Sequence, residues 1–512
     1  MKYHAHQTSM WDAWYLNIKG RIHAFHLQNP LKDCTLPETT AWCVGHAVSD
    51  DLLHWQQCAG VLPPLKDDAN PQDYHAKYTG GAAEKDGKYF LYYTMRDQDG
   101  GTQRIGAALS DDGYQWTIHP GNPVLEPDPD IFIGYGKRNC DWGIVDCRDL
   151  VVVRNPGDGL YYGYFAAAAV VAGRMSPVGV IGVAVSRDLL KWEQQSIVYV
   201  PRSNGMAEVP DVYCIDGTWY LTILTGTNYG GRAVTADEYV TNCTLYAVAD
   251  NPRGPFVEPA DNILIGGIFQ SGFSCRTVEI EGKRYVLYTD RPKSMVVKRD
   301  GVCFDQPATL SLPKELRVDA GGRLGAYWTP LVEKLRTRQL ISPTRPPELT
   351  ERPQNSFAWK TFGGHYTRNG GRYTGQAVGC NWQAAGFQLG AKNIEYNVDV
   401  TLRDAKAAGL WIASRDDGWC HNYVIMLEPG KRRVLLTKFY DFEYCAAREY
   451  PFVPDTAFAL KLVLVDGICE LYVNGQLLLQ CGLEALAVNH AGLFCDRGTA
   501  EFENISLYAL EE

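Results

Sequence analysis

One turn-and-strand signature recurs five times in the first part of the chain, and it limits the chain to a small set of β folds. Each copy has a glycine in a tight turn, followed by a short run rich in aromatic residues, as in KDGKYFLYYT. The glycines of the five turns are Gly20, Gly87, Gly159, Gly217 and Gly282. Successive copies are 58 to 72 residues apart. Glycine turns that lead into such runs are typical of β-hairpins, so each copy predicts one hairpin.

A second signature follows the hairpin in the first three units. An alternating run leads into a Ser-x-Asp turn, and a tryptophan stands six residues after the serine. The copies are GHAVSDDLLHW (Gly45–Trp55), GAALSDDGYQW (Gly106–Trp116) and GVAVSRDLLKW (Gly182–Trp192), and the fourth unit has YAVADNPRGPF (Tyr246–Phe256). Several strands per unit at this period predict a radial array of small sheets, which is a β-propeller. Five units predict five blades, and we expect the repeated tryptophans to be structural.

After the repeats come a proline-rich segment and then a second region of alternating runs. The segment Ile341–Ser356 contains four prolines and few apolar residues, which is typical of a linker. Beyond it, runs such as LKLVLVDGICELYVNGQLLLQC (Leu460–Cys481) alternate and turn at Asn-Gly, as strands of a sandwich do. We therefore expect an all-β chain with a five-bladed β-propeller at residues 1–340, a linker at 341–356 and a C-terminal β-sandwich at 357–512.

Charge and composition exclude several classes of function. The net charge of -10 argues against a nucleic-acid or anionic-membrane partner. The 15 cysteines form no CxxC pairs, and no His, Cys and Asp spacing is typical of zinc or calcium, so we expect reduced thiols and no metal or cofactor. The N-terminal stretch lacks the apolar run of a signal peptide, which favours a cytoplasmic location. A cytoplasmic enzyme acts on imported sugars, so we expect a small substrate.

Three carboxylates stand near the start of the innermost strands of three units. Asp12 lies eight residues before Gly20, Asp149 lies ten before the third glycine, and Glu208 lies nine before the fourth. The second and fifth units have no acid at that offset. Because innermost strands line the axis of a propeller, we expect the three acids to face one pocket. Alone, each acid would more often cap a turn. Together they match glycosidic cleavage, which needs one ionised carboxylate and one protonated acid.

Other residues around these acids are candidates for substrate contact. Trp11, Trp14 and Trp42 are candidates for a wall that stacks on sugar rings, with core packing the equal alternative. Asp211 follows Glu208 closely and is a candidate to hold sugar hydroxyls. Asp141 and Asp146 are expected at the rim of the pocket.

Several of these stretches resemble motifs of glycoside hydrolase family 32, the fructan hydrolases and invertases, within the clan that also holds family 68. GHAVSDDLLHW is similar to its second-strand motif, Arg148–Leu150 to its Arg-Asp-Pro motif, and AEVPDVYCIDGTWYL to its Glu-Cys-Pro-Asp region. SLPKEL and TPLVEKLRT are similar to its run into a C-terminal sandwich. The resemblance implies a five-bladed propeller with a sandwich, in agreement with the repeats.

The resemblance also implies roles for individual residues. Asp12 would be the nucleophile, Glu208 the general acid/base and Asp149 the stabiliser of the transition state, supported by Arg148. The family retains anomeric configuration through a covalent fructosyl intermediate, which requires working carboxyl groups about 5–5.5 Å apart.

The chain departs from the family pattern at four places that bear on the substrate. Asp12 lies in WDAW, closer to the Trp-Asp-Ser-Trp of family 68 than to Asn-Asp-Pro-Asn-Gly. The Phe-Tyr-Gln contact has become Phe25-His26-Leu27, so Gln28 could replace the glutamine only after a register shift. Leu150 stands for the proline of Arg-Asp-Pro, and Val209 for the cysteine after the acid.

These observations favour a retaining β-fructofuranosidase that acts on terminal residues of small fructosides. An inverting arabinofuranosidase resembling family 43, a fructosyltransferase and a non-catalytic carbohydrate-binding propeller remain open alternatives. The expected partner is a small carbohydrate, and the sandwich domain is a candidate surface for a homo-oligomer.

Overall fold

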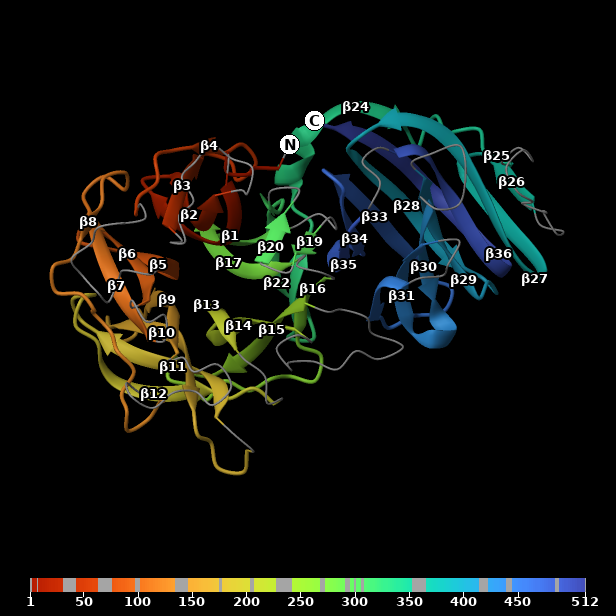
Figure 1. Ribbon diagram of the computed structural model, residues 1–512. Coiled ribbons are helices and arrows are strands. Elements are labelled where there is room, and N and C mark those ends of the chain that lie inside the picture. Colours follow the sequence, from red (N-terminus) through yellow and green to blue (C-terminus); the bar gives the residue numbers. More distant parts are fainter. Residues whose placement is uncertain are drawn as a thin grey trace.

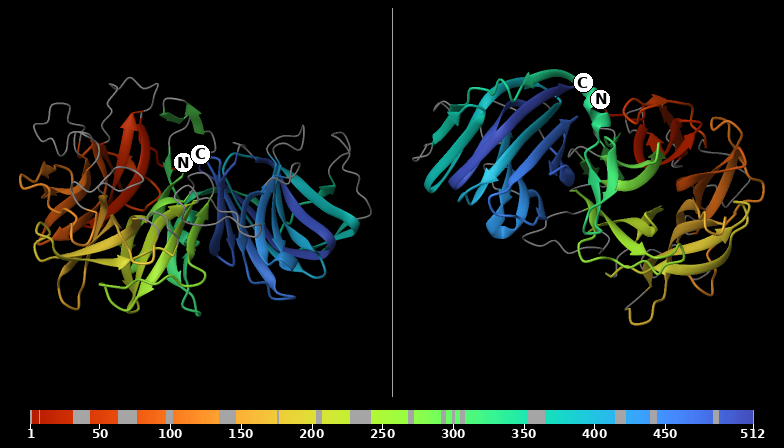
Figure 2. Two further views of the ribbon diagram at one scale, coloured as in Figure 1. Left: turned by 60° about the horizontal axis from the view of Figure 1, so that its bottom comes forward. Right: turned by 180° about the vertical axis from the view of Figure 1, so that it is seen from behind.

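The computed structural model consists of two all-β domains side by side, with the two termini close together (Figures 1 and 2). The structure describes residues 1–512 except 1, 7, 31–42, 63–75, 97–101, 134–145, 175–176, 203–206, 227–241, 268–271, 291–294, 299–300, 305–307, 352–364, 414–421, 439–443, 484–487 and 512. Within the described ranges, no helix is long and apolar enough to cross a membrane.

The N-terminal domain is a β-propeller whose blades follow the order of the five repeats. The first three blades are separate four-stranded antiparallel sheets. The first is β1 (Thr8–Ile18), β2 (Arg21–Pro30), β3 (Cys43–Ser49) and β4 (Gln56–Gln57). The second is β5 (Ala76–Lys85), β6 (Lys88–Arg96), β7 (Gln103–Ser110) and β8 (Thr117–Ile118). The third is β9 (Cys147–Arg154), β10 (Tyr161–Ala169), β11 (Val178–Ser186) and β12 (Glu193–Tyr199).

The fourth and fifth blades complete the ring and join the second domain. The fourth is β13 (Glu208–Ile215), β14 (Thr218–Gly226), β15 (Asn242–Ala249) and β16 (Ile263–Gly267). The fifth is β17 (Phe273–Ile280), β18 (Lys283–Asp290), β21 (Thr309–Leu310), β22 (Lys314–Val318) and β23 (Leu324–Tyr327). A separate hairpin, β19 (Met295–Lys298) and β20 (Gly301–Phe304), follows β18. Both β16 and β23 pair with β35 (Gln476–Gly482) of the second domain, so one hydrogen-bonded network crosses the boundary.

The predicted hairpins are confirmed, and their turns explain the repeated glycines. In the first, second, fourth and fifth units the glycine and the residue before it both have positive φ, as at Lys19 (54°) and Gly20 (90°). Two positive φ values in a two-residue loop define the type I′ turn, whose twist matches that of the strands it joins.

The Ser-x-Asp signature forms the turn between the third and fourth strands of a blade. Ser49 Oγ accepts the N–H of Leu52 (2.9 Å), and Asp51 Oδ1 accepts the N–H groups of Leu53 and His54 (both 2.9 Å). Trp55 then donates its Nε1–H to the carbonyl of Leu52 (3.1 Å). Ser110, Asp112 and Trp116 repeat these bonds in the second blade. The side chains therefore satisfy backbone groups that the short fourth strand leaves unpaired.

The second domain begins earlier than the prolines predicted. A 3₁₀ helix, η2 (Pro330–Leu335), leaves the propeller, and β24 (Arg336–Ile341) already pairs with β36 (Val488–Leu510). The predicted start of the linker at residue 341 is therefore too late. β24 reads RTRQLI and is largely exposed, so it lacks the apolar alternation that would have marked it as a strand. A second short strand, β25 (Thr350–Glu351), also lies inside the predicted linker.

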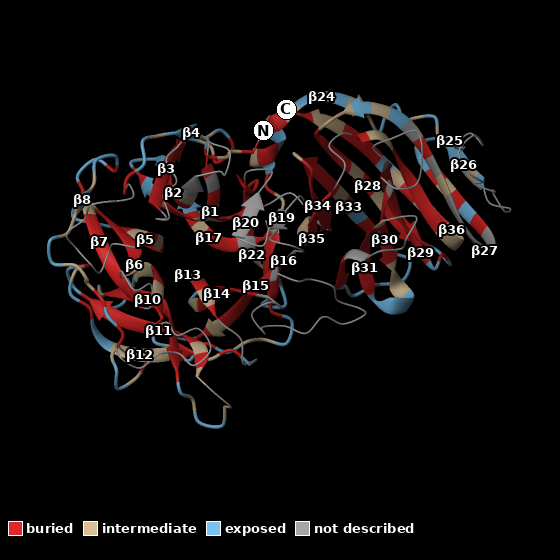
Figure 3. Ribbon diagram, in the orientation of Figure 1, coloured by how far each residue is buried: buried red, intermediate tan, exposed pale blue. Residues whose placement is uncertain are grey.

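The second domain is a β-sandwich in which β36 belongs to both sheets. Its C-terminal half pairs with β24 and β28 (Ile394–Leu402), and its N-terminal half pairs with β29 (Ala407–Ala413). β27 (Arg372–Ala391) follows β36 along both halves. The other strands are β26 (His365–Asn369), β30 (Asn422–Glu428), β31 (Arg433–Lys438), β32 (Tyr444–Glu449), β33 (Ala457–Val465) and β34 (Ile468–Val473). The side chains between the sheets form one large apolar core, and the buried strands of both domains stand out in Figure 3.

Four buried charges lie where the chain start, the fifth blade and the sandwich meet. Lys2 Nζ is 3.1 Å from Asp290 Oδ2, and Lys314 Nζ forms an ion pair with Glu470 Oε1. All four side chains are at most 1% exposed. Tyr472 also donates its hydroxyl to Glu470 Oε2 (2.8 Å). A buried charge is tolerated only when it is paired and hydrogen-bonded. Removal of any one of the four charges would leave its partner buried and unpaired, and would destabilise the contact between the domains.

The variant Glu470→Leu tests this link. It would leave Lys314 buried without its carboxylate, and we expect a loss of about 3–5 kcal/mol in the free energy of unfolding. Denaturant unfolding measures it. The matched control, Asp50→Leu, breaks an exposed pair with Arg21 and should have a far smaller effect. Equal losses for both variants would contradict the account.

Candidate active site

The innermost strand of every blade is interrupted by a β-bulge near its start. The pairing register shifts between Met10 and Ala13 in β1, between Tyr78 and Gly80 in β5, between Glu208 and Asp211 in β13, and between Phe273 and Arg276 in β17. In β9 the shift falls between Arg148 and Val151, opposite Tyr164 and Ala166. A bulge bends its strand and turns a side chain out of the regular alternation. Five bulges therefore form a ring at one end of the propeller axis.

The backbone at three of these bulges adopts a conformation that side chains seldom take. The φ values are 62° at Asp149, 47° at Val209 and 56° at Ser274. A non-glycine residue in the left-handed region costs on the order of 1–3 kcal/mol and persists only where its surroundings impose it. Such strain often marks functional positions, and here it recurs at equivalent places in three blades.

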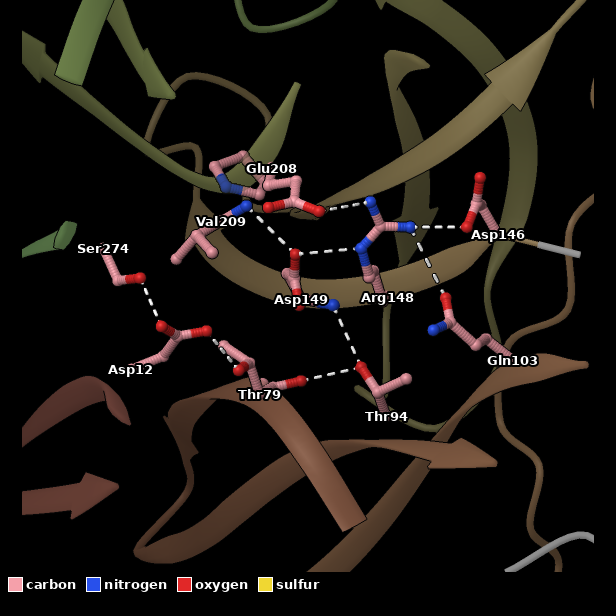
Figure 4. Close-up of polar contacts among 12 residues, drawn as sticks. Asp12, Thr79, Thr94, Gln103, Asp146, Arg148, Asp149, Glu208, Val209 and Ser274 are labelled. Carbon is pink, nitrogen blue, oxygen red and sulfur yellow. Dashed lines mark hydrogen bonds and ion pairs between the residues drawn. The ribbon is translucent and has the colours of Figure 1, made fainter. Parts of the chain in front are cut away.

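Asp12 lies at the bulge of the first blade and is held by hydroxyls from two neighbouring blades (Figure 4). Thr79 Oγ1 of β5 donates to Asp12 Oδ2 (2.6 Å), and Ser274 Oγ of β17 donates to Asp12 Oδ1. Each carboxylate oxygen thus accepts one hydrogen bond. Two hydrogen bonds of this kind fix the plane of the carboxylate.

Asp149, at the bulge of the third blade, is buried and connected to the second and fourth blades. Its Oδ2 accepts the N–H of Val209 (3.0 Å), and its own N–H donates to Thr94 Oγ1 (3.1 Å). Burial raises the pKa of Asp149, Arg148 opposes this effect, and the carboxylates of Glu208 and Asp12 add to it, so that the pKa is about 7. This carboxyl group therefore exchanges its proton near neutral pH.

Glu208, at the bulge of the fourth blade, is bound by an arginine of the third. Arg148 Nη2 donates to Glu208 Oε1 (2.9 Å), and Arg148 Nη1 donates to Asp146 Oδ1 (2.6 Å) (Figure 4). Arg148 Nε also lies 3.6 Å from Asp149 Oδ2. Burial raises the pKa of Glu208, Asp12 adds to this effect, and Arg148 opposes it. One guanidinium thus organises three carboxylates.

The structure brings Asp12, Asp149, Glu208 and Arg148 together, as expected from their positions in the repeats. Asp146 contacts Arg148 directly. Trp11 packs against Val209 and Leu224 beside the bulge that carries Glu208. Trp42 and Asp141 lie outside the described residues.

Trp14 does not face this site. It is 2% exposed and belongs to the apolar core with Phe25 and Tyr93. Regular alternation would place residues 12 and 14 on the same side of β1, but the bulge between Met10 and Ala13 breaks that alternation. Burial leaves no face of Trp14 for a sugar, so the structure assigns it to packing.

Two further candidates are also engaged within the propeller. Asp211 is 5% exposed, and it accepts the N–H of Thr277 (2.7 Å) through Oδ2 and the N–H of Val212 (3.0 Å) through Oδ1. It therefore ties β13 to β17, which favours a structural role. Gln28 lies over Gly45 of β3, with its Nε2 3.6 Å from Cys43 Sγ.

Sequence reasoning missed Thr79 and Ser274, because it searched only for acids. Both lie eight residues before the turn glycine of their unit, at the same offset as Asp12. An alignment of the repeats on their glycines would have placed both hydroxyls at the axis. In the described part of the chain, no group of three or more His, Cys, Asp and Glu residues could hold a metal ion.

Comparisons with known proteins place much of the propeller in a family. Residues 13–259 match the model of the glycosyl hydrolases family 32 N-terminal domain. The chain is 29% identical over 258 residues to a levanase of Bacillus sp. (strain L7), covering 46% of this chain but only 25% of that protein. It is 23% identical over 269 residues to a xylosidase/arabinosidase of Bacteroides ovatus, covering 47% of this chain and 70% of that protein.

The fold as a whole is shared with solved structures. The sucrose-6-phosphate hydrolase from Lactobacillus gasseri superposes with a TM-score of 0.70 at 17% identity, covering 100% of this chain and 93% of that one. This likeness extends over both domains and confirms the propeller followed by a sandwich.

The pKa of Asp149 predicts a specific pH dependence of stability. The folded carboxyl keeps its proton up to about pH 7, whereas an unfolded aspartate loses it near pH 4. The folded state therefore binds more protons in this window, and its stability falls as the pH rises through it. Asp149→Asn removes this loss, so we expect it to be more stable than the wild type at pH 8, with the gain vanishing towards pH 4.

Thermal unfolding from pH 4 to pH 8 measures this difference. The exposed Asp50→Asn serves as the control and should gain no stability as the pH rises. A difference between Asp149→Asn and the wild type that stays constant with pH would contradict the assigned pKa.

Proposed function

Because this chain carries a glycosyl hydrolase family 32 N-terminal domain, we propose that it is a glycosidase that cleaves terminal furanosides, as a retaining β-fructofuranosidase on small fructosides. The observation that carries the proposal is the meeting of Asp12, Asp149 and Glu208, from three blades, in three different environments. Enzymes assign acid and base roles by separating the pKa values of neighbouring carboxyl groups.

The environment of each carboxylate supports its proposed role. Asp12, held by two hydroxyl donors, is the nucleophile. Glu208, whose burial raises its pKa, donates a proton to the leaving oxygen and then removes one from the attacking water. Asp149 binds hydroxyls of the sugar ring and stabilises the positive charge that develops in the transition state. Arg148 contacts both Glu208 and Asp149 and fixes their positions relative to each other.

The reaction proceeds in two displacements. Asp12 attacks the anomeric carbon of the terminal furanoside while the bond to the leaving oxygen breaks and that oxygen takes the proton of Glu208. Water, deprotonated by Glu208, then attacks the same carbon and releases Asp12. Two inversions at one centre give net retention.

A second function has a specific observation in its favour. Similarity to the Bacteroides ovatus xylosidase/arabinosidase supports an arabinofuranosidase. An inverting enzyme of this kind requires carboxyl groups about 6.5–9.5 Å apart, with water between them. Product stereochemistry by NMR separates the two mechanisms.

A hydrolysis panel of sucrose, inulin and levan oligomers, difructose anhydrides and arabinofuranosides tests the substrate class. Release of fructose from the fructosides supports the proposal, and cleavage of arabinofuranosides alone supports the alternative. Product analysis at high sugar concentration would reveal a fructosyltransferase. Binding without turnover on every sugar would point to a non-catalytic propeller.

The nucleophile is tested by Asp12→Ala. With no group to attack the anomeric carbon, we expect kcat to fall on the order of 10⁴-fold or more, with the thermal unfolding profile retained. Asp50→Ala, which removes an exposed carboxylate from a turn, should keep full activity. Activity surviving in Asp12→Ala would disprove the assignment.

The acid is tested by Glu208→Ala with two leaving groups. Loss of proton donation should lower kcat roughly 10²- to 10⁴-fold on a natural fructoside, but far less on an activated aryl fructoside, whose leaving group needs no proton. Initial rates on the two substrates give the ratio. Equal losses on both would show that Glu208 is not the acid.

A further inference from the structure

Arg276 of the fifth blade is a buried arginine that reaches three other blades. It lies on β17, two residues after Ser274, and is 2% exposed. Its Nη1 donates to the carbonyl of Pro210 in β13. Its Nη2 donates to the carbonyls of Asp149 in β9 (3.1 Å) and Gly80 in β5 (3.3 Å). A side chain that joins the innermost strands of four blades must cross the propeller axis.

The three acceptors are not arbitrary points on those strands. Gly80 directly follows Thr79, which binds Asp12. Asp149 is itself one of the three carboxylates. Pro210 lies two residues after Glu208, beyond the strained Val209. The guanidinium thus contacts the backbone at the bulges of the second, third and fourth blades, while the strand that carries it also carries Ser274.

Guanidinium geometry suits this arrangement. Its N–H donors project in fixed directions from one plane, so a single group can hold several acceptors at set distances. Burial lowers the pKa of Arg276, and the carboxylates of Asp211, Asp149 and Asp12 oppose that effect. The arginine therefore supplies both a rigid link and a positive charge close to the carboxylates.

We propose that Arg276 is a positioning residue that sets the geometry of the carboxylate site by fixing the bulges of three blades across the propeller axis. It touches no substrate. It acts through the backbones of Gly80, Asp149 and Pro210, and so holds Thr79, Asp149 and Glu208 relative to Asp12. This proposal rests on the proposed function for its kinetic readouts, but its structural readout does not depend on it.

Arg276→Met and Arg276→Lys test the proposal beside Arg433→Met, which removes a buried arginine of the sandwich that pairs with Glu428. Assays run well below the unfolding temperature of each variant. We expect Arg276→Met to lower kcat on the order of 100-fold, because misplacement of reacting groups by about 1 Å has an effect of that size. KM should change little, and loss of the cation should move the acid limb of the kcat/KM profile to higher pH.

Arg276→Lys keeps the positive charge but loses the planar guanidinium and its fixed donors. We therefore expect a smaller loss than in Arg276→Met, with kcat about tenfold below the wild type. If Arg276→Met does not fold, the kcat and pH profile of Arg276→Lys test the proposal. Arg433→Met should lose stability without a change in kcat or in the pH profile. Wild-type kcat and an unshifted pH profile in a folded Arg276 variant would overturn the proposal, as would equal kinetic losses in Arg433→Met.

A failure of the proposed function would be recognised separately. If the wild type cleaves an arabinofuranoside instead, the same variants are assayed on that sugar. If the wild type cleaves no furanoside of the panel, crystal structures of the wild type and Arg276→Lys test the positioning role. Displaced bulges at Gly80, Asp149 and Pro210 support the positioning role, and unchanged bulges overturn it.

Discussion

The site depends on one constraint, which is that five innermost strands leave regular pairing at the same level of the propeller. A strand in strict alternation sends every second side chain into the packing between blades. A bulge releases one residue from that alternation and turns it towards the axis. Asp12, Thr79, Asp149 and Ser274 all lie at such bulges, and Glu208 opens the fourth. The repeat therefore supplies one bulge in each of the five blades, and the sequence of each blade decides which chemical group lies there.

Burial then gives these groups different properties. Asp149 and Glu208 have raised pKa values because they are removed from water and lie near other carboxylates, and Arg148 limits both shifts. Asp12 instead accepts two hydroxyl donors. Burial of these carboxylates and backbone strain at Asp149, Val209 and Ser274 both lower the stability of the folded protein. The apolar packing of the blades offsets this loss.

Much of this architecture could be predicted from the sequence, because it is encoded locally. A type I′ turn needs positive φ, so a glycine marks each hairpin, and the Ser-x-Asp turn marks the end of the third strand. The positions of Asp12, Asp149 and Glu208 before those glycines were enough to place them together. The strand β24 was missed because its polar, exposed sequence carries no alternation.

The side chains around the carboxylates were harder to predict, because their orientation depends on the bulges. Trp14 belongs to the core, since the bulge between Met10 and Ala13 changes the face on which it lies. The nearness of Asp211 to Glu208 in the sequence indicates a sugar ligand, yet its carboxylate binds the backbone of the next blade. Arg276 gave no signal at all, because its partners are carbonyl groups distant in sequence.

The proposed mechanism requires that Asp12 form a covalent bond to the sugar during turnover. Peptide mass spectrometry of a quenched reaction tests it most directly, with Glu208→Ala and an activated fructoside to slow the second displacement. We expect one hexosyl group on the peptide that contains Asp12, and none when Asp12 is replaced. Turnover without any adduct, or an adduct on Asp149 instead, would contradict it.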